Sequence, residues 1–200
     1  MQITEVKGTE RTRRGFKMDA KTITQDIEKY TAENSNYETS RCYISLSHCA
    51  LGVDEILSQW ENGFKDSLET RLRCYKGYQM EFDMVMRLSK IYPGKIKTAP
   101  EITAFGGLVK GHPDFQFYGR PGDCKSVLMD EWIPQNGKLP RRVYWQMQGY
   151  MLYSENTQSL VIYESREGGR VKAFWVYPNR KVQSEINEKL KMVVKEIREK

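Results

Sequence analysis

Hydrophobic side chains recur at spacings of three and four residues through much of the first half of the chain. The longest such run covers Asp66 to Leu88 and stops before Tyr92-Pro93-Gly94, where proline and glycine cannot continue a helix. We predict a long helix there, preceded by shorter helices over Thr24–Glu33 and Ser45–Trp60. The predicted core stripe of the long helix consists of Leu68, Leu72, Tyr75, Phe82 and Met86.

From Lys95 onward, short alternating runs broken by glycine and proline replace the helical spacing. The predicted strands are Ile96–Phe105, Leu108–Val109, Phe115–Tyr118, Cys124–Leu128, Leu160–Glu164 and Val171–Tyr177, with tight turns at Gly106-Gly107 and Gly119-Arg120-Pro121-Gly122. A helix over Arg141–Tyr153 interrupts them, and a closing helix buries Ile186, Leu190, Val193, Val194 and Ile197. This order predicts an α/β (α+β) domain with a central mixed β-sheet flanked by helices.

Composition places the chain among soluble folded proteins. It has 200 residues, of which 39% are hydrophobic, 29% charged and 12% aromatic, and no long apolar run indicates a membrane span or a secretory signal. We therefore expect one domain over residues 21–200, a basic N-terminal arm over residues 1–20, and a cytoplasmic location. The four cysteines have no metal-binding spacing and are expected to be reduced thiols.

The net charge of +6 comes from the two ends of the chain. Residues 1–21 hold six basic and three acidic residues, and residues 179–200 hold seven and four. This distribution suits a polyanionic partner such as nucleic acid, and it is equally what a solvated tail and a solvated helix face produce.

Candidate chemistry gathers where the strand pattern predicts burial. Side chains alternate faces along a strand, so Asp123 and Lys125 share one face and Cys124 points to the other. If Asp114 lies on the neighbouring strand, two carboxylates meet beside one lysine, which is an oxygen-ligand site for Mg²⁺ or Mn²⁺. The alternative is a surface hairpin with an ordinary Asp–Lys pair across its strands.

Four motifs in order resemble those of the PD-(D/E)XK nuclease superfamily, in particular its RecB-like and lambda-exonuclease (YqaJ) branches. They are Gly77-Tyr78-Gln79-Met80-Glu81, Gly111-His112-Pro113-Asp114, Asp123-Cys124-Lys125-Ser126 and Gln146-Met147-Gln148-Gly149-Tyr150. The resemblance implies a restriction-endonuclease-like core. It also implies a Mg²⁺- or Mn²⁺-dependent deoxyribonuclease, with no iron–sulfur cluster because no cysteine follows Cys124.

The same resemblance implies roles for individual residues. Asp114, Asp123 and the backbone carbonyl of Cys124 would bind the metal, and Glu81 would hold a second metal or its water. Lys125 would orient the attacking water and stabilise charge on the phosphate. Gln146 and Tyr150, at i and i+4 of one helical face, would position the site or the scissile strand.

Two of these assignments have ordinary structural alternatives. Glu81 shares a helical stripe with Val85 and Leu88, which points its carboxylate inward or into a cleft, but a surface glutamate paired with Arg73 or Lys90 would have the same spacing. The helix that carries Gln146 and Tyr150 must also bury Val143, Met147 and Met151 as an amphipathic core helix.

Basic residues near the motifs suit contacts with a DNA backbone. They are Lys110, His112, Arg120, Lys138, Arg141 and Arg142, and the 138–142 stretch is the strongest basic patch. We expect an exonuclease that acts on linear duplex or single-stranded DNA in recombination or repair, in a bacterial cell or a phage-infected host. Because the sequence lacks a GxxxxGK[ST] motif, unwinding would need a helicase partner, and a single-strand annealing protein is another expected partner.

Other functional classes remain open at this point. An endonuclease of restriction or junction-resolving type would use the same metal site. A non-catalytic nucleic-acid-binding module could keep the fold, although clustered carboxylates would repel its phosphates. A metabolic enzyme acting on a small substrate would need a cofactor or phosphate-binding fingerprint, and the sequence has none.

Overall fold

The computed structural model describes residues 43–62 and 68–200, which belong to one structural unit over residues 39–200. The expected N-terminal arm and the expected helix Thr24–Glu33 lie outside the described residues. Within the described part, no helix is long and apolar enough to cross a membrane.

A five-stranded sheet forms the centre of the domain, in the order β2-β5-β6-β7-β8. Its strands are β2 (Ile96–Lys97), β5 (Phe115–Phe117), β6 (Arg120–Val127), β7 (Ser159–Ser165) and β8 (Val171–Val176). The sheet is mixed, because β6 and β7 run parallel and the other neighbours run antiparallel. A smaller sheet in the order β1-β4-β3 contains β1 (Ile44–Ser45), β3 (Ile102–Ala104) and β4 (Val109–Gly111).

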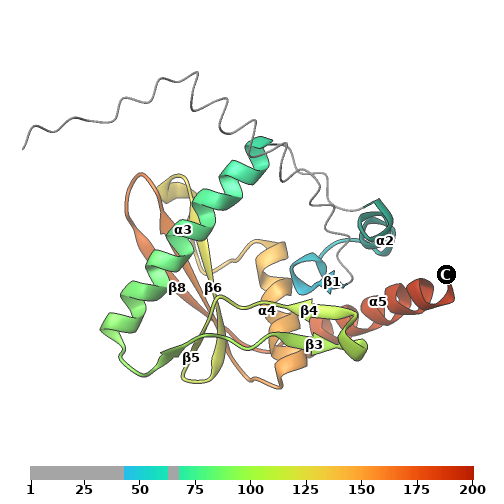
Figure 1. Ribbon diagram of the computed structural model, residues 1–200. Helices are drawn as coiled ribbons and strands as arrows, with labels where there is room; N and C mark the ends of the chain where they lie inside the picture. The colour runs from blue at the N-terminus through green and yellow to red at the C-terminus, as the bar shows by residue number, and fades with distance from the viewer. Residues whose placement is uncertain (1–42, 63–67) are drawn as a thin grey trace, which may run out of the picture. The chain divides into compact units, whose positions relative to one another are not determined.

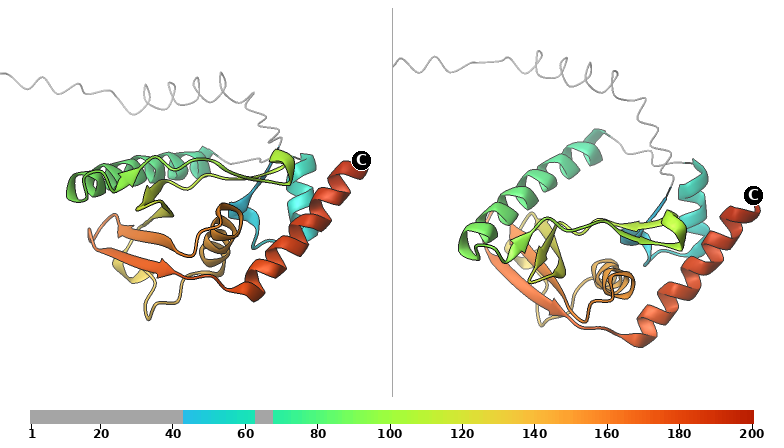
Figure 2. Two further views of the ribbon diagram at one scale, coloured as in Figure 1. Left: turned by 90° about the horizontal axis from the view of Figure 1, so that it is seen from below. Right: turned by 60° about the horizontal axis from the view of Figure 1, so that its bottom comes forward.

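Helices cover both faces of the central sheet, as the sequence predicted. Helix α3 (Leu68–Ile91) lies across one face against β6 and β2 (Figure 1). Helix α4 (Arg141–Ser154) packs on the other face against β7 and β8, with β3 and α5 (Arg180–Glu199) as its further neighbours (Figure 2). The sheet therefore separates an α3 face from an α4 face.

Each face has its own hydrophobic core. On the α3 face the buried residues are Met84, Phe115, Cys124, Leu160 and Ile162. The larger core on the α4 face includes Met147, Met151, Val161, Tyr163 and Phe174, and the stripe of α5 completes it. Ile186, Leu190, Val193 and Val194 of that stripe are buried and Ile197 is partly buried, as predicted.

The first part of the predicted helix Ser45–Trp60 is wrong. Ile44 and Ser45 form β1, which pairs in parallel with β4, and the backbone N–H of Ile44 donates to the carbonyl of Leu108 at 2.7 Å. A single 3-10 turn, η1 (Leu46–His48), follows, and helix α2 begins only at Val53 and ends at Asn62. Pairing with a strand distant in sequence overrides the local helical spacing.

Helix α3 forms as predicted, but its predicted core stripe is rotated. Phe82 is 66% exposed and Met86 46% exposed, whereas Met84 is buried and Val85 and Leu88 pack beside it. The side chains of Leu68, Leu72 and Tyr75 lie outside the described part. Both stripes have helical spacing, and the position of the sheet decides which one is buried.

The predicted strand Ile96–Phe105 divides into β2 and β3, which belong to different sheets. Likewise, the turn between β5 and β6 is shorter than predicted. Only Tyr118 and Gly119 form it, with φ of 51° and 79°, which are the positive values that a two-residue type I′ hairpin turn requires.

The residues from Arg120 to Gly122, which were predicted to lie in the turn, belong to β6 instead. Pro121 is tolerated there because the pairing of β6 with β7 starts only at the next residue. Gly122 is required for packing, since a Cβ at this position would lie 2.3 Å from the ring of Phe115.

Candidate active site

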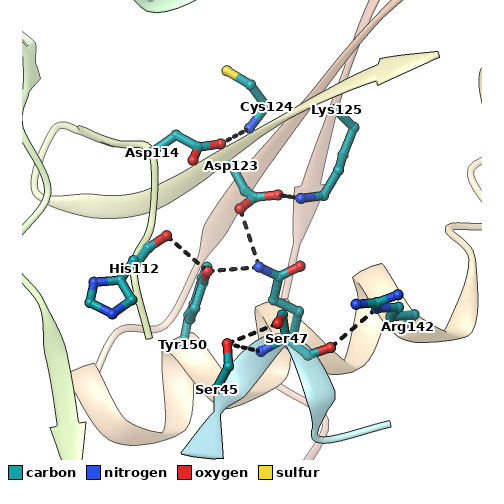
Figure 3. A network of polar contacts seen from close by, with 10 residues as sticks. Ser45, Ser47, His112, Asp114, Asp123, Cys124, Lys125, Arg142 and Tyr150 are labelled. Atoms are coloured by element: carbon teal, nitrogen blue, oxygen red, sulfur yellow. Dashed lines mark hydrogen bonds and ion pairs between the residues drawn. The ribbon is translucent and has the colours of Figure 1, made fainter. Parts of the chain in front are cut away.

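Two aspartates meet where β5 and β6 run side by side. Asp114 precedes β5, and its backbone N–H donates to the carbonyl of Gly122 at 2.9 Å. Its carboxylate Oδ2 accepts the backbone N–H of Cys124 at 2.6 Å (Figure 3). This bond fixes the Asp114 carboxylate beside the segment of β6 that carries Asp123.

Asp123 and Lys125 share the α4 face of the sheet, as the strand alternation predicts. Their side chains form an ion pair (Figure 3), and Asp123 is only 2% exposed. Cys124 points to the opposite face, into the core around Met84. The neighbouring strand β7 pairs in register with this segment and shields it, because all seven of its residues are buried. The Asp–Lys pair is therefore not part of an open surface hairpin.

Helix α4 supplies the two polar side chains that approach from the other side. The Gln146 amide Nε2 donates to Asp123 Oδ1 at 3.3 Å and to the Tyr150 hydroxyl at 2.7 Å. The Tyr150 hydroxyl in turn donates to the carbonyl of His112 at 3.1 Å (Figure 3). Gly111 makes this approach possible, because a Cβ there would lie 2.8 Å from the Tyr150 ring.

The pKa values of both aspartate carboxyl groups are raised by their surroundings. Burial, followed by the charge of Asp123, raises the pKa of Asp114 from its ordinary value of 3.8 to about 8. Burial also raises the pKa of Asp123, against the opposing attraction of Lys125. Two such carboxylates are unfavourable together unless a cation shares the site.

Lys125 and Tyr150 both keep their protons in this environment. Burial favours the neutral form of Lys125, but the charges of Asp123 and Asp114 outweigh it and raise the pKa of the ammonium group. Burial, assisted by Asp123, raises the pKa of Tyr150 well above its ordinary value. The site therefore holds a fixed cation and a neutral hydroxyl donor.

Glu81 belongs to the same electrostatic environment. Burial raises the pKa of this α3 carboxyl, while the charges of Lys125 and Arg166 lower it and that of Asp123 raises it. Its described electrostatic partners are thus the residues of the site rather than Lys90, and the side chain of Arg73 lies outside the described part. Among the described residues, however, no three His, Cys, Asp or Glu side chains are arranged to hold a metal ion.

The donor set nevertheless suits a hard divalent cation. Asp114 and Asp123 offer carboxylate oxygens, and β6 adds the backbone carbonyl of Cys124. Mg²⁺ usually binds through one or two carboxylates and keeps several waters, so a third carboxylate is not required. Glu81 could then act through a water.

The candidate DNA contacts divide between two regions. In the first region, Lys110 forms an ion pair with Glu101 at 2.9 Å, and His112 Nε2 lies 3.6 Å from the same carboxylate. The backbone carbonyl of His112 is the group that accepts the Tyr150 hydroxyl. At the start of α4, Arg142 donates to the carbonyl of Ser47 at 3.3 Å, and Arg141 lies over the Trp145 ring.

Lys138 precedes these arginines on an exposed loop. Arg120 is different, because it lies over the Trp175 ring, 5.8 Å from its centroid. Its register position places it on the α3 face, with Phe117, Gly122 and Cys124. The structure therefore separates Arg120 from the Asp123–Lys125 pair.

Sequence reasoning missed one residue of the site, Arg166. It follows β7, and its Nε donates to the Ser126 hydroxyl at 2.7 Å. Its charge also lowers the pKa of Glu81. Only the parallel register of β6 and β7 brings this arginine to the motif, and no local pattern indicates that register.

Comparison with known proteins bears on the fold. The sequence matches no protein-family model and no curated protein. Among solved structures, it is similar to LHK-Exo in complex with dAMP, with a TM-score of 0.60 and 13% identity over 80% of this chain and 90% of that one. Another structure of that alkaline exonuclease, from Laribacter hongkongensis, gives a TM-score of 0.57 and 13% identity, covering 86% and 94%.

A phage-related exonuclease from Haemophilus somnus 129PT is also similar. Its TM-score is 0.54 at 12% identity, and the likeness covers 76% of this chain and 92% of that one. These neighbours are exonucleases that match in architecture along most of their length. The chain thus shares its fold with these exonucleases, as the order of its motifs predicted.

Proposed function

We propose that this protein is a divalent-metal-dependent DNA exonuclease. The observation that carries the proposal is the pair of the buried Asp123 and the half-buried Asp114, held next to the protonated Lys125 in an exonuclease fold. A domain that only bound nucleic acid would gain nothing from buried carboxylates, because they repel phosphate and destabilise the fold.

The proposed metal ligands are Asp114, Asp123 and the carbonyl of Cys124, with Glu81 holding a water or a second ion. Mg²⁺ or Mn²⁺ fits this set, because both ions prefer oxygen ligands. When bound, the ion would offset the charge of the carboxylates, acidify a water and stabilise charge on the phosphate.

The protein's own side chains would do the remaining work. The ammonium group of Lys125 would stabilise the charge that develops on the phosphate and orient the attacking water. Gln146 would hold Asp123 in place through its amide, and Tyr150 would connect that amide to the backbone of His112. Such supporting hydrogen bonds keep the reacting groups in position.

DNA would reach the site along the edge formed by β4 and the start of α4. His112 and Lys110 lie at the first element, and Lys138, Arg141 and Arg142 at the second. Cations at these positions suit phosphate contacts. The LHK-Exo structure contains dAMP, which supports a nucleotide ligand for this fold. The proposed role is the processing of DNA ends in recombination or repair, in the cytoplasm of a bacterium or a phage-infected host, with an annealing protein or a helicase as partner.

Product analysis tests the proposal. Purified protein is incubated with end-labelled linear duplex, single-stranded oligonucleotide and covalently closed circular DNA, in Mg²⁺, Mn²⁺ or EDTA. We expect metal-dependent release of short products from linear DNA and no cutting of the circle. Cutting of the circle would instead select the endonuclease alternative, and DNA binding without cleavage in any metal would refute the proposed activity.

A further inference from the structure

An exposed group of aromatic rings lies at the end of the sheet where β5 turns into β6. Phe117 is its centre, with ring centroids 5.2 Å from Tyr92, 4.7 Å from Tyr118 and 6.1 Å from Trp175. Tyr92 is 43% exposed, Tyr118 54% and Trp175 42%. We call these four residues the aromatic platform. Large rings exposed together on one surface mark a site of interaction.

Positive charge surrounds the platform. The Lys95 ammonium lies 5.0 Å from the Tyr118 ring centroid, and the Arg120 guanidinium 5.8 Å from that of Trp175. The segments 90–97 and 115–122, which carry three of the four rings, contain four basic residues and no acidic one. Neither Lys95 nor Arg120 forms a described ion pair. The platform therefore combines exposed aromatic rings with cations that pair with no carboxylate of the described residues.

The platform is separate from the candidate active site. Trp175 pairs with Leu160, and Leu160 with Gly122, so all three lie on the α3 face. Asp123 and its partner Val161 point to the α4 face. A molecule on the platform would consequently lie across the sheet from the Asp123–Lys125 pair.

We propose that the aromatic platform binds single-stranded nucleic acid. Exposed aromatic rings interleaved with cations are the features by which proteins hold single strands, because unpaired bases stack on the rings and phosphates contact the basic groups. Base pairs in a duplex are already stacked and cannot use such rings. Charge complementarity favours a polyanion over a second copy of this chain, whose net charge is +6.

Equilibrium binding of a fluorescein-labelled oligothymidylate of about 15 nucleotides, a length typical of single-strand sites, tests this proposal. The full chain carries Asp123→Asn and is kept in EDTA, so that no cleavage interferes. We expect Trp175→Ala and Tyr118→Asn each to weaken binding about tenfold. Asparagine is used at position 118 because its φ is positive, which asparagine tolerates.

Trp132→Ala is the matched control. Trp132 is 58% exposed and lies in η3 (Asp130–Trp132). This turn contacts β7 at the end of the strand that is opposite to Leu160. The Trp132→Ala variant should bind the oligonucleotide as tightly as the Asp123→Asn protein does. Lys95→Ala and Arg120→Ala should weaken binding and reduce the dependence of the affinity on salt. Thermal unfolding of each variant confirms that the fold is intact.

Two results would overturn the proposal. One is unchanged affinity for the oligonucleotide in the double variant of Trp175 and Tyr118. The other is a wild-type protein that self-associates in sedimentation, platform variants that do so less, and no loss of affinity for the oligonucleotide in those variants. That result would make the platform an interface between copies of the chain. Because binding is measured without cleavage, this outcome is independent of the nuclease assay.

Discussion

Replacing Asp114 by asparagine should make the metal-free protein more stable at pH 8 while abolishing hydrolysis. The pKa of this carboxyl is about 8 in the folded protein, against an ordinary value of 3.8. Between these pH values the folded state binds more protons at this group than the unfolded state does. The contribution of Asp114 to the free energy of unfolding therefore falls as the pH rises from about 4 to 8, and stays level above that.

The size of the effect follows from the difference between the two pKa values. A difference of about 4 corresponds to about 6 kcal/mol at 1.4 kcal/mol for each pKa unit, which is the upper limit of the gain. Asparagine keeps an oxygen that accepts the Cys124 N–H but must bury its own amide. We therefore expect a net stabilisation of about 2–4 kcal/mol at pH 8, and a destabilisation of similar size at pH 4, where only the cost of burying the amide remains.

Urea unfolding in EDTA at pH 4, 6 and 8 measures this effect, with Asp54→Asn as the control. Asp54 is an exposed carboxylate on α2 and should show no such gain. Addition of Mg²⁺ should stabilise the wild-type protein and not the Asp114→Asn variant. A variant that is less stable than wild type at pH 8, or a gain that does not grow with pH, would refute the electrostatic account of the site.

Two further predictions concern the residues that support the site. Gln146→Ala should lower the hydrolysis rate about tenfold to a hundredfold, because Asp123 and Tyr150 lose the amide that connects them; an unchanged rate in a gel-based cleavage assay would contradict this. Gly122→Ala should destabilise the fold by about 1–3 kcal/mol in urea unfolding, because its Cβ would overlap the Phe115 ring. The control is Gly77→Ala, whose added Cβ would meet nothing within 4 Å beyond its own helix backbone, and it should stabilise α3 by up to about 1 kcal/mol. Equal effects of the two substitutions would refute the packing argument.

Local geometry was enough to predict much of the site. Alternation along a strand placed Asp123 and Lys125 on one face, and the i, i+4 spacing placed Gln146 beside Tyr150. These relations depend only on the period of a strand or a helix, so they hold in any fold that forms the element. The motif order then supplied the fold, which the structural neighbours confirm.

Features that depend on distant partners could not be predicted. Ile44 joins a strand because Val109 pairs with it, although its neighbours have helical spacing. The buried stripe of α3 is the one with Met84, because the sheet lies on that side, and Phe82 is left exposed. Arg166 reaches the site only through the register of two parallel strands.

The most direct test of the account is the rate at which linear end-labelled duplex is hydrolysed in Mg²⁺ by wild type, Asp123→Asn and Lys125→Met. Asp54→Asn and Lys191→Met serve as controls, since both residues are exposed and distant from the site in sequence. The account predicts a loss of about a hundredfold to a thousandfold for Lys125→Met and at least as much for Asp123→Asn, with both controls unchanged. Hydrolysis at the wild-type rate by either site variant would contradict it.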